Sequence, residues 1–447
     1  MEALSALSPP SRGWTRRNFL VATAGGAAGL AAQGVRAATF RCDATPFKGE
    51  PLIWTKPLET VLDPLWAKGV VLEHGRRRLV LCAMDWCGLA GAAFRQFQRA
   101  LASAAGAKPP DVILHTVHQH AAPYVDGDAY RLLRSLPDPP LMYSQRGLDE
   151  LAGRLAAAVQ GALSQMEPVD AVGIAQVRVE RVASSRRVWD RGKLVVRYSN
   201  AGKDPYQASL PEGHIDPWLR TITLACRGRP LIRLHFYATH PQTFCCDGRA
   251  SADFVGEARE KLEQEEGVAQ VYFTGAAGDV TVGKYNDGSE AARRALAERL
   301  LAAMKAAATE TRLEPLRTLD CRTLPVHLPR RMPEKQIEPT AGGETRYRIA
   351  CWHATARRKE PFHVTAVTLG PARILHLPGE PLLEFQEYAQ RLDPQRFIAV
   401  AGYGDIAPGY ICPDRAFDEG GYEPSASWVG RGAESVLKQA IRQALGA

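Results

Sequence analysis

The chain has 447 residues, of which 45% are hydrophobic and 23% are charged, and its formal net charge is +8 at pH 7. This composition is typical of a globular protein with a substantial core, arranged as one large domain or two intimate ones. Basic residues such as the pair Arg186–Arg187 are scattered and lack interleaved aromatic residues, so they indicate solvated loops and exclude a nucleic-acid surface. No apolar segment is long enough to span a bilayer in the mature protein. A transient contact with an anionic membrane surface and the oligomeric state stay open.

The N-terminus carries the pattern of a twin-arginine export signal. Residues 15–20 read Thr-Arg-Arg-Asn-Phe-Leu, residues 21–32 are apolar, and residues 35–37 form a small-residue cleavage site. A chance Arg-Arg pair in a disordered terminus is the alternative, but the Phe-Leu that follows the pair, the apolar run and the cleavage site favour export. We therefore predict a signal at 1–37, one domain at 38–447 and a periplasmic or secreted protein. Whether the signal is cleaved stays open.

Hairpins and helices are predicted in turn along the rest of the chain. The hydrophobic pattern predicts strands at 69–72, 78–84, 111–117, 172–179, 219–226, 231–238, 270–273, 323–328, 364–369, 373–377 and 397–401. It predicts helices at 92–105, 147–166, 253–265, 290–309 and 434–445. Residues 186–217 are polar and predict a long loop on the substrate side. The mixture favours an α/β fold of packed mixed and antiparallel sheets flanked by helices, and no internal repeat is evident.

Nine cysteines are an odd number for an oxidising compartment. Their spacing fits no zinc-finger pattern, and Cys245 and Cys246 are adjacent. We expect buried thiols and one or two disulfides, without assigning the pairs.

Three of the eleven histidines lie within six residues, directly after the apolar run 112–114. They are His115, His118 and His120, at the end of a predicted buried strand, where α/β enzymes usually place their chemistry. Residues two apart in a strand point the same way, so His118 and His120 are expected to share one site. Because imidazole is the commonest protein metal ligand, this cluster predicts a metal centre.

A hydrolytic zinc ion takes three or four N/O ligands and keeps one position for water. The remaining ligands are therefore expected at the ends of other predicted strands. His240 follows the predicted strand 231–238, and Glu380 follows the strand 373–377 after a Pro-Gly turn. Each residue alone is more often structural or a helix cap. Three of them at three strand ends make a metal site the better interpretation.

Short motifs also succeed one another along the chain: 117–123 (VHQHAAP), 238–243 (ATHPQT), 251–256 (SADFVG), 277–281 (AGDVT), 378–380 (PGE), and 401–405 (AGYGD) with 408–410 (PGY) and 422–423 (YE). Their order and residue types resemble the neutral/alkaline (non-lysosomal) ceramidases. The resemblance covers about residues 50–440 and corresponds to the catalytic-type domain alone. That family consists of zinc-dependent amidases that split ceramide into sphingosine and a fatty acid.

The resemblance implies zinc ligands at His118, His240, Glu380 and Tyr410, with Tyr422 as the alternative to Tyr410. It implies an amidase that uses Zn²⁺ and a zinc-activated water to hydrolyse a small lipid-like N-acyl substrate. With the predicted signal, this would be an exported enzyme.

Two further residues are implied in catalysis. His120 is expected beside the metal, where it would polarise the substrate carbonyl or the oxyanion, and Thr281 replaces a family serine that contacts the reacting group. Three carboxylates are candidates for support of the ligands, although a structural role is the more frequent one: Asp85, Asp253 and Asp279.

Two departures from the family pattern leave the substrate open. Ala121–Ala122 stand where the family has Ser-Gly, and Asp405 stands where it has asparagine. The alternatives are a zinc hydrolase of another amide or ester, and a non-catalytic metal-binding relative. A metallo-β-lactamase site is set aside because Ala122–Pro123 do not supply the Asp-His pair that it needs. Another divalent ion in place of zinc also stays open.

Overall fold

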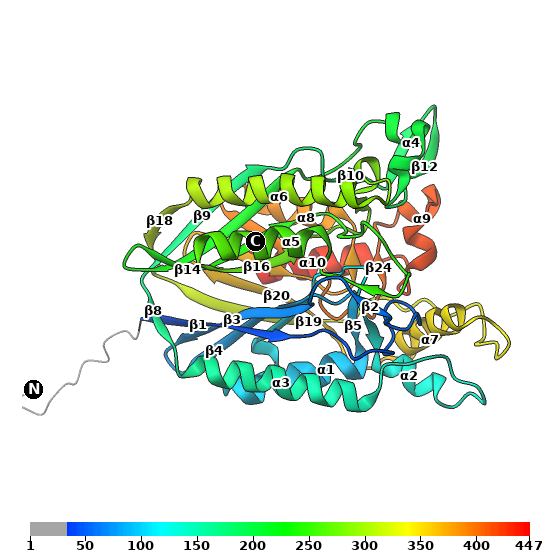
Figure 1. Cartoon of the computed structure of the whole chain (residues 1–447), viewed down its shortest axis with the longest axis horizontal. Coiled ribbons are helices and arrows are strands. Elements are labelled where there is room, and N and C mark those ends of the chain that lie inside the picture. Colours follow the sequence, from blue (N-terminus) through cyan, green and yellow to red (C-terminus); the bar gives the residue numbers. More distant parts are fainter. Residues whose placement is uncertain (1–33) are drawn as a thin grey trace, which may run out of the picture. The chain divides into compact units, whose positions relative to one another are not determined.

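Three sheets of mixed strand direction form the framework, with helices packed on their outer sides (Figure 1). The computed structural model describes residues 34–447, which form one compact unit. The predicted export signal therefore lies outside the described residues up to position 33, while its last residues, 35–37, belong to the first strand, β1 (Val35–Asp43). Among the described residues, no helix combines the length and apolarity needed to cross a membrane.

The first sheet has the strand order β6-β4-β3-β1-β8. Its strands are antiparallel, except that β4 and β6 run parallel. The crossover from β4 to β6 contains α1 (Gly91–Ala105), in which Phe94, Phe97 and Leu101 are buried at helical spacing. The other elements are β3 (Trp66–His74), β4 (Arg77–Met84), β6 (Val112–Thr116), α3 (Gln145–Leu163) and β8 (Glu167–Val169).

The second sheet has the order β16-β14-β13-β9-β18, and only its pair β14–β16 is parallel. A helix, α5 (Asp253–Glu266), again connects the two parallel strands. Figure 1 shows α5 and α6 on the outer side of this sheet, opposite α1 and α3 on the first. The other elements are β9 (Ala171–Arg178), β13 (Trp218–Cys226), β14 (Arg229–Tyr237), β16 (Ala269–Thr274), α6 (Glu290–Glu310) and β18 (Arg312–Pro315).

The third sheet has the order β19-β20-β21-β23, with β21 and β23 parallel and joined through α8 (Leu383–Leu392). Its final helix, α10 (Ala433–Leu445), packs on β19 and β20. The strands are β19 (Leu319–Val326), β20 (Phe362–Leu369), β21 (Ala372–His376) and β23 (Phe397–Ala401).

The three sheets repeat one topology, which the sequence did not reveal. Each begins with an antiparallel strand and a hairpin, crosses over through a helix to a parallel strand, and closes with another helix. Side-chain periodicity inside the repeats is too unspecific to expose them, because any buried strand favours the same apolar residues. The repeat gives three pairs of parallel strand ends, and it is from these ends that the site is built.

His115 joins the ends of the three sheets. It lies in β6, its Nε2 accepts the backbone N–H of Thr274 at the end of β16, and its Nδ1 donates to the carbonyl of Gly402 just after β23. Burial, followed by the neighbouring His376, lowers the pKa of His115 well below 6.5, so the ring is neutral. The residue is structural, and it fixes the loops that follow β6, β16 and β23 against one another.

The predicted helices and strands are all present, with shifts of a few residues at their ends. The sequence interpretation missed β1, α7 (Gly343–Arg357) and the crossover helix α8. It described as loop the hairpin β11 (Arg187–Asp190) and β12 (Lys193–Val196), with α4 (Pro205–Ser209) after it. Short elements complete the fold: β2 (Thr60–Val61), β5 (Gly88–Ala90), β7 (Tyr124–Asp126), α2 (Gly127–Leu133), β10 (Ser184–Ser185), β15 (Arg249–Ala250), β17 (Val280–Thr281), β22 (Glu380–Pro381), β24 (Tyr410–Ile411) and α9 (Ala416–Glu419).

Candidate metal centre

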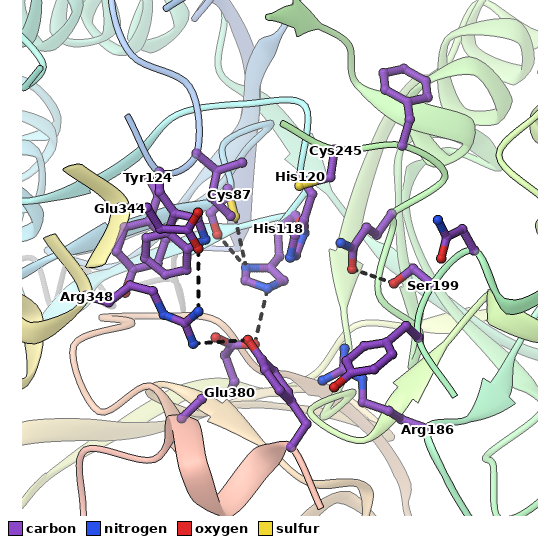
Figure 2. Close-up of a pocket in the computed structure, with 18 of the residues that line it drawn as sticks. Cys87, His118, His120, Tyr124, Arg186, Ser199, Cys245, Glu344, Arg348 and Glu380 are labelled. Atoms are coloured by element: carbon purple, nitrogen blue, oxygen red, sulfur yellow. Dashed lines mark hydrogen bonds and ion pairs between the residues drawn. The ribbon is translucent and has the colours of Figure 1, made fainter. Parts of the chain in front are cut away.

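Loops from all three sheets bring His118, His240 and Glu380 together. Figure 2 shows His118 and Glu380 of this group beside each other. The Oε2 atom of Glu380 lies 3.2 Å from Nε2 of His118 and 3.4 Å from Nε2 of His240. The three donor atoms lie within 4.8 Å of one another, and all three residues are buried. The residues predicted from three separate strand ends therefore form one cluster, which could hold a metal ion.

Both histidines present the lone pair of Nε2 to this cluster. His118 donates through Nδ1 to the carbonyl of Cys87, and His240 donates through Nδ1 to the carbonyls of Ala277 and Val280, at 2.8 and 3.0 Å. These bonds assign the proton to Nδ1 and leave Nε2 free to bind a metal. Burial, then nearby Arg186, lowers the pKa of His240 to about 4, which also favours the neutral ring.

The cluster fits a cation because its three facing atoms lack another partner. Nε2 of His118, Nε2 of His240 and Oε2 of Glu380 are buried and have no hydrogen bond among the described residues. Buried polar atoms are almost always paired, and two imidazole lone pairs facing a carboxylate oxygen repel one another. A divalent ion between them would satisfy all three atoms at once.

The reason given for the pairing of His118 with His120 was wrong. The strand β6 ends at Thr116, and His118 lies beyond it with φ 73°, in the left-handed region. A turn, not strand alternation, brings the two rings to a centroid distance of 4.7 Å. The N–H of His118 donates to the carbonyl of Trp86, and its ring stacks on Tyr403. These contacts hold the residue in a conformation that non-glycine residues rarely adopt.

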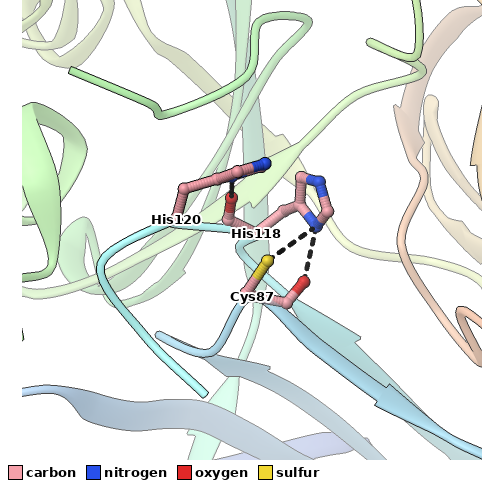
Figure 3. A group of neighbouring side chains, drawn as sticks. All are labelled: Cys87, His118 and His120. Carbon is pink, nitrogen blue, oxygen red and sulfur yellow. Dashed lines mark hydrogen bonds between the residues drawn. The ribbon is translucent and has the colours of Figure 1, made fainter. Parts of the chain in front are cut away.

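A second group, Cys87 with His118 and His120, is less suited to a metal (Figure 3). The Nδ1 atoms of His118 and His120 already donate to the carbonyls of Cys87 and His118, respectively. Burial raises the pKa of the Cys87 thiol well above 9.0, which disfavours the thiolate that binds metals. Burial and His118 lower the pKa of His120 well below 6.5. His120 is thus a neutral ring in the cavity wall.

Tyr410 lies beside the cluster. It pairs with Glu380 in the register of the parallel strands β22 and β24, and its ring is parallel to that of His240 at 6.5 Å. Its hydroxyl accepts a hydrogen bond of 2.9 Å from Nη1 of Arg186. The alternative, Tyr422, also lines the cavity, and its hydroxyl accepts from Arg348 at 3.4 Å.

Arg186 and Arg187 are not solvated, contrary to the sequence interpretation. Arg186 is 3% exposed and lies 3.7 Å from the fully buried carboxylate of Glu423, and Arg187 donates to the same carboxylate at 2.9 Å. Despite burial, Tyr410 and Glu423 raise the pKa of Arg186 above its usual value, so it stays charged. No hydrophobic periodicity marks this pair, and their partner Glu423 lies more than 200 residues away along the chain.

Thr281 lies behind the cavity wall. It is buried in β17, and its hydroxyl donates to the hydroxyl of Ser199 at 3.0 Å. Ser199 in turn donates to Oε1 of Gln242, and both Ser199 and Gln242 line the cavity. Sequence reasoning missed Ser199, which lies in the polar segment 186–217.

The three supporting carboxylates each hold a loop in place. Asp85 forms a bidentate ion pair with Arg259, with both distances 2.8 Å and both side chains fully buried. Asp253 accepts from the N–H and hydroxyl of Thr243, in the loop after His240. Asp279 accepts from the N–H of Leu383, just after Glu380. These contacts match the structural role that was expected to be the more frequent one for Asp85, Asp253 and Asp279.

A cavity of about 500 Å³ opens onto the cluster. Its walls combine aromatic rings with paired charges, since Arg348 of α7 lies over the ring of Trp54 at 5.3 Å and 3.5 Å from the carboxylate of Glu344. Further aromatic lining comes from Tyr124, Tyr198, Phe244, Tyr410, Tyr422 and Trp428. The site thus combines three buried atoms that could hold a metal ion with a cavity that has both apolar and polar walls.

No protein-family model matches the sequence, and no curated protein matches it. The solved structures that are similar in fold include two ceramidases. One is neutral ceramidase from Pseudomonas aeruginosa, with a TM-score of 0.71 and 15% identity over 93% of this chain and 75% of that chain. The other is a ceramidase complexed with C2, with the same TM-score and identity over 92% and 75% of the two chains. The α/β architecture of residues 34–447 is therefore the fold of neutral ceramidase.

Proposed function

We propose that the chain is a metal-dependent amide hydrolase of the ceramidase type. The observation that carries the proposal is the set of three buried, unpaired atoms on His118, His240 and Glu380 at the end of an organic-ligand cavity. Two neutral imidazoles and a carboxylate are a ligand set typical of hydrolytic zinc sites, so zinc is the proposed ion. When bound, zinc would polarise a carbonyl as a Lewis acid and supply a nucleophile at neutral pH by acidifying water.

Tyr410 is proposed as the fourth ligand, with Arg186 as its support. Burial raises the pKa of the Tyr410 hydroxyl well above 10.0, and the adjacent guanidinium opposes this rise because it stabilises negative charge on the phenol oxygen. Because Arg186 is itself held by Gly278 and Glu423, it keeps the Tyr410 ring in one orientation. Tyr422 would then face the substrate from the cavity wall.

His120 is proposed as a proton acceptor. Its Nδ1–H donates to the carbonyl of His118, so Nε2 of the neutral ring carries a lone pair. An acceptor can take a proton from the attacking water and pass it to the leaving amine. Once Nε2 has taken up this proton, the same atom is a donor, which suits the predicted polarisation of the substrate carbonyl or the oxyanion.

An N-acyl lipid such as ceramide is the proposed substrate, supported by the likeness of fold to two ceramidase structures and by the aromatic cavity walls. A different amide or ester is the second candidate. It is favoured by the ion pairs Arg348–Glu344 and Arg249–Asp247 in the cavity wall, because paired charges suit a polar group of the substrate. Export through the twin-arginine signal is proposed from residues 15–37.

Hydrolysis of a fluorogenic N-acyl-sphingosine by wild type, His240→Ala and the surface control His74→Ala tests this function. We expect turnover by wild type and His74→Ala, its loss on chelation and its return with added zinc. His240→Ala should lose at least about 10³-fold in kcat/KM. Turnover that survives both chelation and His240→Ala would contradict the proposal, and turnover of other amides alone would move the substrate to the second candidate.

A further inference from the structure

The wall of the cavity contains a disulfide between adjacent residues. Cys245 and Cys246 are bonded to each other, and Cys245 lines the cavity (Figure 2). Cys246 is exposed, whereas six of the seven free cysteines are buried and the seventh, Cys226, is partly buried. Thiol–disulfide exchange requires access of a thiolate to one of the two sulfur atoms. This bonded pair is therefore open to exchange from solvent at the edge of the proposed active site.

The loop around the pair is anchored on both sides. Before it, the N–H and hydroxyl of Thr243 donate to Asp253 at 2.9 and 2.8 Å. After it, the carbonyl of Gly248 accepts from the N–H of Glu59 at 2.8 Å. The segment between these anchors, residues 244–247, holds the pair at its centre, so a change at the disulfide stays within that short segment.

The metal ligand on the same loop does not depend on that segment. His240 precedes the first anchor, its N–H donates to Val280, and its Nδ1 donates to Ala277 and Val280. In contrast, Phe244 adjoins the pair, lines the cavity and packs against the guanidinium of Arg249 at 4.6 Å. Opening the disulfide would thus move the cavity wall and leave the metal cluster in place.

The backbone of Cys246 indicates how the loop would change when the disulfide is reduced. Cys246 has φ 65°, in the left-handed region that non-glycine residues rarely occupy. The covalent ring formed by two bonded neighbours restricts this residue, and two separate thiols would not. The reduced loop is therefore expected to leave this conformation and to alter the position of Phe244.

We propose that Cys245–Cys246 is a reversible redox site whose partner is a dithiol reductant and whose state sets substrate entry to the cavity. A thiolate of the reductant attacks Sγ of Cys246, the S–S bond breaks, and Cys245 leaves as a thiolate that takes up a proton. The second thiol of the reductant then displaces Cys246 and closes the reductant's own disulfide. Two electrons and two protons pass to the protein, and an oxidising compartment would favour the bonded form.

The test compares native, metal-loaded wild type before and after treatment with dithiothreitol. The variant Cys245→Ser/Cys246→Ser cannot form the disulfide and represents the open form. Cys226→Ser is the control. Iodoacetamide labelling with mass spectrometry should find two new reactive thiols at 245 and 246. Hydrogen exchange should rise in residues 244–247, between the two anchors. The effect on substrate entry rests on the proposed function, and it should be a change in KM on the order of fivefold, with unchanged metal content.

The outcomes separate the two proposals. The double serine variant should match the reduced protein and ignore dithiothreitol, while Cys226→Ser should respond like wild type. If no amide is hydrolysed, the proposed function fails, but labelling and exchange still decide whether the loop is redox-sensitive. The redox site is overturned if the native pair resists reduction, or if the double variant has the exchange and KM of the oxidised wild type.

Discussion

His118 and Tyr403 occupy corresponding places in two of the three repeats. His118 lies two residues past β6 and Tyr403 two residues past β23, and each of these strands is the second of the two parallel strands in its sheet. Both have left-handed backbones, with φ of 73° and 54°, and their rings stack at a centroid distance of 4.4 Å. Tyr403 is fully buried. The contact joins the first and third sheets beside the cluster of His118, His240 and Glu380. The orientation of a proposed metal ligand therefore depends on an aromatic ring from a distant part of the chain.

Replacement of Tyr403 tests this dependence. Tyr403→Ala removes the stacked ring from a close-packed site and should lower the free energy of unfolding by about 3–5 kcal/mol. It should also weaken metal binding, because His118 loses the surface that fixes its ring. Tyr403→Phe keeps the ring and removes only a buried hydroxyl that has no partner among the described residues, so stability and metal content should be retained. Denaturant unfolding and metal analysis of the two variants check this, and equal effects would contradict it.

His115 should be needed for stability and not for the chemistry itself. His115→Phe keeps an aromatic ring at this position but leaves the N–H of Thr274 and the carbonyl of Gly402 unpaired in the core. Two unsatisfied buried groups should cost about 2–5 kcal/mol. The exposed His74→Phe is the matched control and should change stability by less than about 0.5 kcal/mol. Similar unfolding midpoints for the two variants would show that His115 does not link the sheets.

Asp126 should make the protein less stable as the pH rises. It caps α2 through Oδ1, its Oδ2 lacks a partner among the described residues, and burial raises its pKa to about 7. Between about pH 4 and 7, Asp126 is therefore protonated in the folded state and ionised in the unfolded state. Stability is highest below the unfolded pKa and declines as the pH rises through 7, by on the order of 2–4 kcal/mol.

The isosteric variant isolates this group. Asp126→Asn keeps the capping oxygen and has no charge at any pH, so it should equal wild type near pH 4 and be the more stable of the two at pH 8. Urea unfolding of both proteins across this range measures the difference. A constant difference at every pH would show that Asp126 does not titrate in this way.

Removing one member of the buried pair Asp85–Arg259 should be more harmful than removing both. Arg259→Met leaves a fully buried carboxylate without its ion pair, which should cost about 3–5 kcal/mol. Asp85→Leu/Arg259→Met removes both charges and should recover part of this loss. Thermal unfolding of the single and double variants gives the comparison, and a strictly additive double variant would contradict the coupling.

The proposed metal ligands could be predicted from sequence because their signals are local. His118, His240 and Glu380 each follow a short apolar strand, and the order of motifs placed them in one family-like pattern. Arg186 and Ser199 could not be predicted, since they lie in a polar segment whose burial depends on Glu423 and on Gln242 and Thr281. The conformation of His118 also depends on a turn beyond its strand, which the strand pattern does not describe. The threefold topology follows from strand pairing between distant segments, which apolar periodicity leaves undetermined.

Metal content of the purified protein tests the central claim most directly. Mass-spectrometric metal analysis should find about one zinc per chain in wild type and in His74→Ala, and well under a tenth of that in His118→Ala, His240→Ala and Glu380→Gln. Circular dichroism on the same samples verifies that the variants are folded. A folded wild-type protein without stoichiometric divalent metal, even after incubation with zinc, would contradict the account.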